Sequence, residues 1–347
     1  MMEITWRSPS NIALIKYWGK HGNQLPNNAS LSLTLHEAYT ETSIALKSKR
    51  KKSTPDIDFY FEGKKNAVFA GKIIRYLDSI KDELSFIQDH KLVIRSENSF
   101  PHSAGIASSA SSMSALALCL MSIQSGFSNK QSDYDTFLKN ASYYARLGSG
   151  SAARSIFPEF SVWGETKWVK NSSDQHAIPF PKEYHPNFND LQDSILIVSD
   201  QEKAVSSRAG HDLMKKHPSA GLRYKNAEQR LSELIRSMRS GDLNLFVKII
   251  EAEALELHAL MMTSDPSFIL LAPATLEIIN RIRQFRLDTK IPVCFTLDAG
   301  PNVHIIYPYF EKKSVRNFIQ SELLKFCRNK KVIYDGMGTG PSQIISD

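Results

Sequence analysis

Three separated segments of the chain combine small, hydroxyl-bearing and charged residues, at 8–20, 101–111 and 295–302. The middle segment follows an alternating apolar run at 91–96 and precedes a helical apolar pattern that starts at Met113. Its small residues therefore lie where a helix begins. Backbone amides at a helix N-terminus lack intrahelical acceptors and carry partial positive charge, so they attract phosphate oxygens. The middle segment thus predicts a phosphate-binding site.

Five residues of this segment are the candidates for phosphate contacts, because small side chains let oxygens approach the amides and hydroxyls add donors. They are Gly105, Ala107, Ser108, Ser109 and Ser111. No Gly-Lys-Ser/Thr sequence follows, and the glycine spacing of a dinucleotide-binding motif is missing, so the segment matches neither of those phosphate-binding loops. Taken alone, these residues also fit a tight packing point at a helix start.

Asp298 and Lys16 each allow two interpretations. Asp298 lies in a Leu-Asp-Ala-Gly-Pro-Asn turn, where its carboxylate could satisfy turn amides or take part in chemistry. Lys16 lies in an apolar strand pattern at 12–18, and a buried lysine needs a partner because removing its charge from water is costly. Asp298 and phosphate oxygens are the candidate partners. On an edge strand, the lysine would instead extend into solvent.

A compact cluster at 149–154 follows a helical pattern and contains Ser149, Ser151 and Arg154. The hydroxyls can donate hydrogen bonds, and a guanidinium can hold a carboxylate or phosphate through two parallel ones. The cluster therefore predicts an anion site. An ordinary Gly/Ser loop with a solvent-facing arginine is the alternative.

Together these motifs resemble those of the galactokinase, homoserine kinase, mevalonate kinase and phosphomevalonate kinase superfamily. The segments at 11–20 and 146–155 are similar to signatures of the diphosphomevalonate decarboxylases within it. The resemblance implies an α+β fold of two domains, with an N-terminal half like the second domain of ribosomal protein S5. It also implies an active site in the cleft between the two halves.

The activity that the resemblance implies is the ATP-dependent decarboxylation of mevalonate 5-diphosphate to isopentenyl diphosphate, with ATP and Mg2+ as cofactors. Asp298 would act as the base, Lys16 would support the charge of the transferred phosphate, and the residues of 105–111 would hold ATP. The residues implied to bind the substrate are Tyr17, Lys20, Ser149, Ser151, Arg154 and Arg208. No protein side chain is expected to ligate a metal.

The chain departs from the family pattern at a few positions near these residues. His211 replaces the usual methionine, and Asn27 and Ala29 replace hydroxyl residues. None of these changes removes a proposed catalytic group.

Alternatives to this function remain at the level of sequence. A relative could use mevalonate 5-phosphate or only phosphorylate the 3-hydroxyl, and a non-catalytic protein could sense a nucleotide or an isoprenoid precursor. A nucleic-acid module is disfavoured, because the basic residues do not interleave with aromatic ones.

Composition agrees with an enzyme that binds anions. The 347 residues carry a formal net charge of +7, which would steer polyanionic substrates such as a diphosphate and ATP. The densest basic run, 47–52, is typical of a solvated loop. Cys119, Cys294 and Cys327 are far apart, which favours a reducing cytoplasm. Neither an export signal nor a membrane segment is expected, and a homodimer remains open.

The hydrophobic patterns predict two domains, 1–185 and 186–347, joined by an irregular stretch at 170–190. Expected in the first are short strands up to 61, a helix at 67–80, a strand from 91, and helices at 109–124 and 133–146. Expected in the second are a strand at 194–199, helices at 222–238, 243–257 and 273–286, and paired strands at 293–297 and 304–307. The two halves must therefore approach each other to bring Lys16 and Asp298 together.

Overall fold

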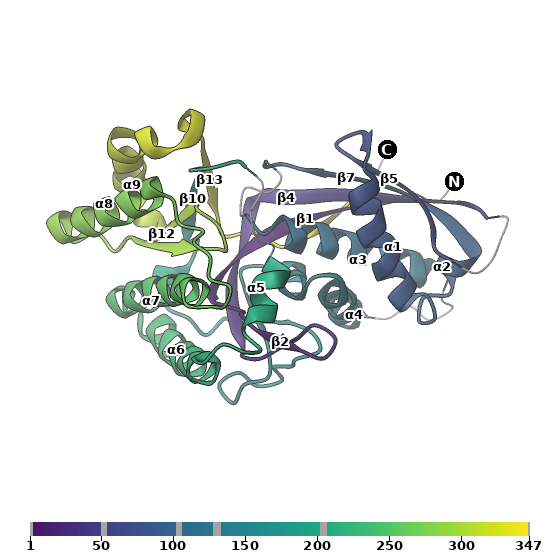
Figure 1. Ribbon diagram of the computed structural model, residues 1–347, viewed down its shortest axis with the longest axis horizontal. Helices are drawn as coiled ribbons and strands as arrows, with labels where there is room; N and C mark the ends of the chain where they lie inside the picture. The colour runs from purple at the N-terminus through teal and green to yellow at the C-terminus, as the bar shows by residue number, and fades with distance from the viewer. Residues whose placement is uncertain (1–2, 50–53, 102–105, 128–132, 202–206, 346–347) are drawn as a thin grey trace.

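The computed structural model describes residues 3–49, 54–101, 106–127, 133–201 and 207–345. The first half is built on an eight-stranded sheet in the order β14-β1-β4-β7-β5-β6, with β8 paired to β4 and β9 paired to β8 (Figure 1). Its strands are β1 (Glu3–Ile15), β4 (Ser30–Ser48), β5 (Asp56–Phe61), β6 (Lys64–Lys65), β7 (His90–Asn98), β8 (Phe160–Trp163), β9 (Ile178–Pro179) and β14 (Ser342–Ile344). A separate small hairpin pairs β2 (Lys20–His21) with β3 (Leu25–Pro26).

The prediction of short strands up to 61 is wrong for the first two main strands, because β1 spans 13 residues and β4 spans 19. Their antiparallel pairing shifts register between Pro9 and Asn11 and again between Ala13 and Ile15. Such irregularities bend a strand without ending it. β1 and β4 therefore each continue as one long, curved strand through these two irregularities.

Helices pack against this sheet, and three of them lie close to the ranges that the sequence predicts, 67–80, 109–124 and 133–146. The helices are α1 (Ala67–Ile80), α2 (Phe86–Asp89), α3 (Ser108–Phe127) and α4 (Tyr134–Gly148), and the 3-10 helix η1 (Gly150–Ile156) follows. By length and composition α3 could span a membrane, but 67% of that stretch is buried inside the fold. This burial identifies α3 as a core helix. Hydrogen bonds between Ser111 and Thr40 and between Ser114 and Ser8 place its first turns beside β4 and β1.

The second half has three layers (Figure 1). Its sheet has the order β11-β12-β10-β13, with α6 and α7 on one face and α8 and α9 on the other. The strands are β10 (Gln192–Leu196), β11 (Cys294–Leu297), β12 (Val303–Tyr307) and β13 (Val332–Gly336); the helices are α5 (Ser207–Leu213), α6 (Ala220–Ser240), α7 (Leu243–Met262), α8 (Pro273–Thr289) and α9 (Lys312–Phe318). The three predicted long helices and the antiparallel strand pair are confirmed.

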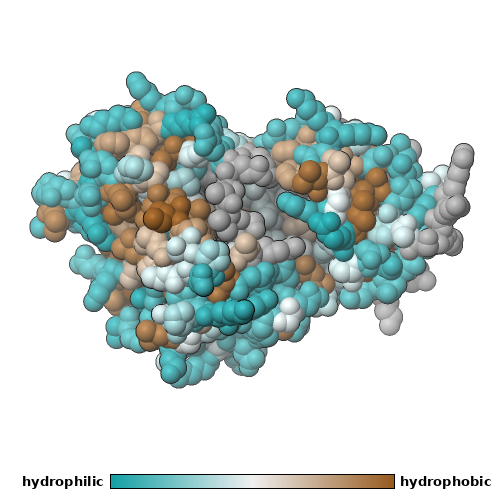
Figure 2. All heavy atoms as spheres, in the orientation of Figure 1, coloured by the Kyte–Doolittle hydropathy of each residue, from teal (hydrophilic) through white to brown (hydrophobic). Residues whose placement is uncertain are grey.

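The halves share both a strand and a core. β14 returns to pair with β1, so the last described strand lies in the first half's sheet. One hydrophobic cluster joins Leu31 and Leu33 of β4 to Leu231 of α6 and Ile250 of α7. Figure 2 shows the two lobes with a dip between them along one edge. The shared core fixes the orientation of the residues contributed by each half, while the boundary at 185 remains a prediction.

Candidate active site

Lys16 directly follows the end of β1, where the sequence had predicted the strand to continue. Its side chain is 2% exposed, and Nζ has no hydrogen-bond partner among the described residues. Burial lowers the pKa of Lys16 to about 8, against the opposing effects of Asp298 and Glu253. The interpretation as a solvent-extended edge lysine is therefore wrong, and a buried cation with an unused donor group remains.

Asp298 follows β11 immediately and comes from the opposite half of the molecule. Its carbonyl oxygen accepts hydrogen bonds from His258 Nε2 at 3.1 Å and from Gly300 N at 2.7 Å, which fix the turn. Its negative charge raises the pKa values of Lys16 and Arg154, so all three groups lie within electrostatic range of one another. The structure thus brings the predicted acid and the predicted lysine together across the two halves.

Arg154 lies on η1 and is 2% exposed, so the alternative of a solvent-facing arginine is wrong. Its guanidinium donates to Asn11 Oδ1 at 3.4 Å and to Ser30 Oγ at 2.6 Å, both neutral oxygens. Burial lowers its pKa to about 10, and the guanidinium stays positively charged at neutral pH. A buried guanidinium held by neutral acceptors keeps its charge available for an anionic ligand.

Ser149 and Ser151 lie next to the start of α3. Ser149 Oγ donates to Ser109 Oγ at 3.3 Å, and the Ser149 and Ser151 hydroxyls are 3.4 Å apart. The end of α4 and the start of η1 thereby meet the start of α3. Two segments predicted separately, one for phosphate and one for substrate, are adjacent in the fold.

The phosphate segment is placed only in part, because Gly105 lies outside the described residues. Ala107 has φ +46°, and the helix begins at the next residue, Ser108. Ser10 Oγ donates to Ile106 O at 2.6 Å and ties the segment to β1. Ser109 is exposed, which leaves this helix start accessible.

Ser111 differs from the other predicted phosphate contacts. It is fully buried, its hydroxyl is 2.6 Å from Thr40 Oγ1, and it also donates to Ser108 O at 3.3 Å. In this structure the hydroxyl holds α3 against β4. A direct ATP contact by Ser111 would require those bonds to break.

Tyr17 belongs to a cluster of aromatic rings. The ring centroid of Tyr17 is 4.7 Å from that of Trp163 and 4.3 Å from that of His211. The Tyr17 hydroxyl is buried without a hydrogen-bond partner in the described parts of the chain, and burial raises its pKa. Lys20 Nζ donates to Gln24 Oε1 at 2.8 Å. The side chain of Arg208 lies outside the described residues.

His211, noted in the sequence only as a departure from the family, has a defined position here. Its Nδ1 accepts a hydrogen bond from Gly19 N at 2.9 Å, and its ring packs on Tyr17 and Trp18. Burial, assisted by the charge of Lys20, lowers its pKa to about 3. A neutral imidazole therefore connects α5 to the segment that carries Tyr17 and Lys20.

The groups that bind the Lys16 backbone are not predicted from the sequence. Lys16 N donates to Glu253 Oε2 at 2.8 Å, and Lys16 O accepts from Arg223 Nη2 and Asn28 Nδ2, both at 3.0 Å. Glu253 and Arg223 lie within ordinary amphipathic helical patterns, so only their complete burial distinguishes them.

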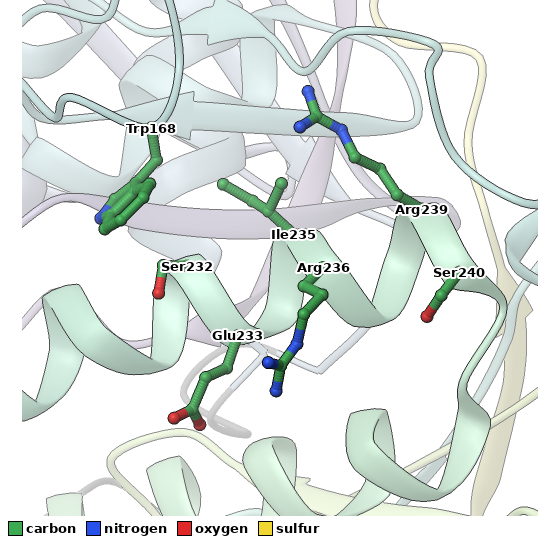
Figure 3. Close-up of a pocket in the computed structure, with 7 residues that line it drawn as sticks. All are labelled: Trp168, Ser232, Glu233, Ile235, Arg236, Arg239 and Ser240. Carbon is green, nitrogen blue, oxygen red and sulfur yellow. The ribbon is translucent and has the colours of Figure 1, made fainter.

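A surface hollow of about 570 Å3 lies elsewhere, along the outer side of α6 (Figure 3). Its lining residues are Trp168, Ser232, Glu233, Ile235, Arg236, Arg239 and Ser240. None of the described motif residues lines it. Within the described residues, no group of three histidine, cysteine or acidic side chains could hold a metal ion.

Comparison with known proteins agrees with this arrangement. Residues 8–175 match the family model for the diphosphomevalonate decarboxylase-like N-terminal domain, and residues 194–343 match that for the mevalonate 5-diphosphate decarboxylase C-terminal domain. A diphosphomevalonate decarboxylase of Ganoderma lucidum is 30% identical over 92% of this chain and 80% of its own length.

Solved structures extend the likeness to the whole fold. The mevalonate diphosphate decarboxylase of Staphylococcus aureus is 29% identical with a TM-score of 0.83, over 99% of this chain and 98% of its own. A structure described as MDDEF in complex with MVAPP, AMPPCP and magnesium is 30% identical with a TM-score of 0.83, over 99% of both chains. With both halves matched and the motif residues of both halves brought together, the chain belongs to the diphosphomevalonate decarboxylase family.

Proposed function

We propose that this protein catalyses the ATP-dependent decarboxylation of mevalonate 5-diphosphate to isopentenyl diphosphate, with release of ADP, phosphate and carbon dioxide. Beyond family membership, one observation carries the proposal. A carboxylate from β11, a buried lysine from the end of β1 and a buried arginine from η1 act on one another electrostatically. These are the groups that a phosphoryl transfer to an alcohol beside a carboxylate requires.

The first step is transfer of the γ-phosphoryl group to the 3-hydroxyl of the substrate. Asp298 accepts the hydroxyl proton as the oxygen attacks phosphorus, and Lys16 offsets the charge on the transferred group. Ser108, Ser109 and the amides at the start of α3 hold ATP phosphates. The small side chain of Ala107 leaves room for the approach to those amides, and Gly105, outside the described residues, stays a predicted contact.

The second step is loss of the new phosphate together with carbon dioxide. The C3–O bond breaks, its electrons leave with phosphate, and positive charge develops at C3. The electrons of the bond to the carboxylate then form the double bond between C2 and C3. Arg154 orients the carboxylate through its planar guanidinium, so that this bond is aligned for cleavage.

We assign the binding of the substrate's diphosphate to a second set of groups. They are Tyr17, Lys20, Ser149, Ser151 and Arg208. The adjacency of Ser149 to Ser109 supports placing the two phosphate-bearing ligands next to each other. Such an arrangement brings the γ-phosphorus close to the 3-hydroxyl.

The metal enters with the nucleotide, as MgATP. Mg2+ in sites of this kind retains waters and is bound largely through substrate phosphates. The hydroxyls of Ser108 and Ser109 and the amides at the start of α3 would hold the phosphates that carry the ion. A related protein has been solved in complex with AMPPCP and magnesium.

The location and assembly of the protein are also proposals. Cys119, Cys294 and Cys327 are buried free thiols, which supports a reducing compartment such as the cytoplasm. The two-domain division at 185 and 186 and the homodimer stay predictions.

The test is a coupled assay of ADP and carbon dioxide with mevalonate, mevalonate 5-phosphate and mevalonate 5-diphosphate as separate substrates. We expect equal amounts of ADP and carbon dioxide with the diphosphate alone. ADP without carbon dioxide would indicate a 3-kinase, a response to the monophosphate would indicate the related decarboxylase, and no turnover would indicate a sensor.

A further inference from the structure

The peptide group of Lys16 is held on both sides by one buried ion pair. Glu253 Oε2 accepts from Lys16 N at 2.8 Å, and Arg223 Nη2 donates to Lys16 O at 3.0 Å. Arg223 and Glu253 also bind each other through two parallel hydrogen bonds, each of 2.8 Å. The side chains of both are fully buried. The pair therefore fixes the backbone from which the Lys16 side chain extends.

The ion pair belongs to a network on α6 and α7, whereas Lys16 follows β1 in the other half. Glu256 Oε2 accepts from Arg223 Nη1 at 2.6 Å, and Arg230 Nη1 donates to Glu253 Oε1 at 2.8 Å. Two arginines and two glutamates make the network neutral. Burial favours the neutral form of Arg223, but the two glutamates raise its pKa, so the pair stays ionised.

Stability alone is a weak explanation for such a pair, since a buried ion pair often stabilises a fold no better than apolar residues of similar volume. Its position suggests a second role. The charges that act on the Lys16 side chain come from four elements. Asp298 after β11 and Glu253 on α7 favour the charged form, whereas Arg154 on η1 and Arg223 on α6 disfavour it.

We propose that Glu253, paired with Arg223, is a positioning residue for phosphoryl transfer, which holds the Lys16 backbone and keeps the Lys16 side chain charged at the site of transfer. This inference rests on the proposed function, in which Lys16 acts on the transferred phosphate. The orientation follows from the two backbone hydrogen bonds. The charge follows from a carboxylate that is close, buried and poorly screened.

Glu253→Gln removes the charge at nearly constant shape, and the amide oxygen can still accept from Lys16 N. Its NH2 group then faces the donors Arg223 Nη1 and Arg230 Nη1, so some loss of stability is expected as well. Loss of the negative charge leaves the network positive, so the pKa of Lys16 falls below about 8. We expect the alkaline limb of the kcat profile to move down by about one pH unit, the lower range for a neighbouring charge. At pH 8, about half of the parent's Lys16 and about a tenth of the variant's would be charged, so kcat should fall about fivefold with KM little changed.

Glu256→Gln is the matched control. Glu256 binds the same Arg223 and Arg230, but it makes no hydrogen bond to Lys16 within the described residues, and its carboxylate is partly exposed. Its charge is therefore better screened, and we expect a shift of the limb below about 0.3 pH unit. The proposal would be overturned if Glu253→Gln and Glu256→Gln lost the same thermal stability and both kept the pH profile of the parent.

Glu253→Asp provides a second variant should Glu253→Gln not fold. It keeps the charge but shortens the side chain, so it should weaken the contact with Lys16 N and lower kcat without moving the limb. If the alkaline limb of Glu253→Asp shifts by as much as the shift predicted for Glu253→Gln, the inference is contradicted.

An NMR titration separates failure of this inference from failure of the proposed function. Lysines labelled with 13C at Cε report the pKa of Lys16 without turnover, and its signal is identified by its loss in Lys16→Arg. A pKa of Lys16 that drops in Glu253→Gln and not in Glu256→Gln supports the inference even if the parent releases no carbon dioxide. Unchanged values in both variants would refute it even if the parent is an active decarboxylase.

Discussion

At the scale of single residues, the two buried cations of the site form no hydrogen bond to a carboxylate within the described residues. Arg154 is held by an amide and a hydroxyl oxygen, and Lys16 Nζ has no hydrogen-bond partner in the described chain. Burying such groups is costly unless a charged partner arrives. The arrangement is therefore suited to binding anions, with Asp298 as the acid that the structure brings near both cations.

Asp298→Asn tests the proton acceptor. The amide keeps the shape of the side chain but cannot take the proton of the 3-hydroxyl, so turnover should fall at least about a hundredfold while both substrates still bind. Carbon dioxide release and calorimetric titration measure the two effects. Asp288→Asn, an exposed acid on α8, is the control and should behave like the parent. Near-normal carbon dioxide release by Asp298→Asn would exclude the role.

Arg154→Lys tests whether the planar guanidinium matters. Lysine keeps the charge but cannot make two parallel hydrogen bonds, and the loss of one charge-assisted bond corresponds to about tenfold to a hundredfold in kcat/KM. Steady-state kinetics with saturating ATP measures this, and Arg154→Ala should be worse. Arg239→Lys, at an exposed pair with Glu183, should be neutral. Parent-like kinetics for Arg154→Lys would mean that the residue is only a structural cation.

At the scale of elements, the start of α3 is the part of the site that local sequence predicts best. The predicted phosphate site lies at a helix N-terminus, and the spacing of the apolar residues from Met113 onward indicates that helix. Long amphipathic segments such as α1, α6, α7 and α8 are predicted for the same reason. β13, β14 and α9 are not predicted, because each is short and the two strands depend on pairing with strands distant in sequence, β10 and β1.

The same distinction applies to the residues of the site. Asp298, Lys16 and Arg154 stand out as candidates because they interrupt small or apolar motifs, and their roles come from the family resemblance. Glu253 and Arg223 were not, because a charged residue within an amphipathic helix usually faces solvent and only the fold turns these two inward. The role of His211 depends on a contact with Gly19, 192 positions away in the chain, which no local pattern encodes.

Replacement of Ser108 and Ser109 by alanine tests the helix start as a nucleotide site. The loss of two hydroxyl donors should weaken ATP affinity by about tenfold and mevalonate 5-diphosphate affinity by less. Because Ser149 donates to Ser109, the single change Ser108→Ala separates the nucleotide contact from that neighbouring contact. Calorimetric titration with each ligand measures the difference. Equal losses for both ligands would argue against a dedicated nucleotide site.

At the scale of the whole molecule, the geometry of the site depends on how the two halves are joined. The shared core around β4, α6 and α7 is one connection, and the return of the chain to pair β14 with β1 is another. A third is polar. The carboxylate of Asp335, on β13 of the second sheet, accepts from the backbone amides of three consecutive residues of β4, namely His36, Glu37 and Ala38, each at 2.8 Å.

Asp335→Asn tests that polar connection. An asparagine would place its own N–H group against at least one backbone donor, leaving a buried amide without an acceptor. Loss of one or two hydrogen bonds to a charged group should lower the free energy of unfolding by about 2–4 kcal/mol. Urea denaturation followed by fluorescence measures this. Asp288→Asn, at an exposed position whose carboxylate accepts from Gln284 on the same helix, should stay within about 0.5 kcal/mol of the parent. If Asp335→Asn unfolds at the parent's urea midpoint, the carboxylate does not join the halves. In that case the shared apolar core and the pairing of β14 with β1 would keep Lys16 and Asp298 close together without the Asp335 carboxylate.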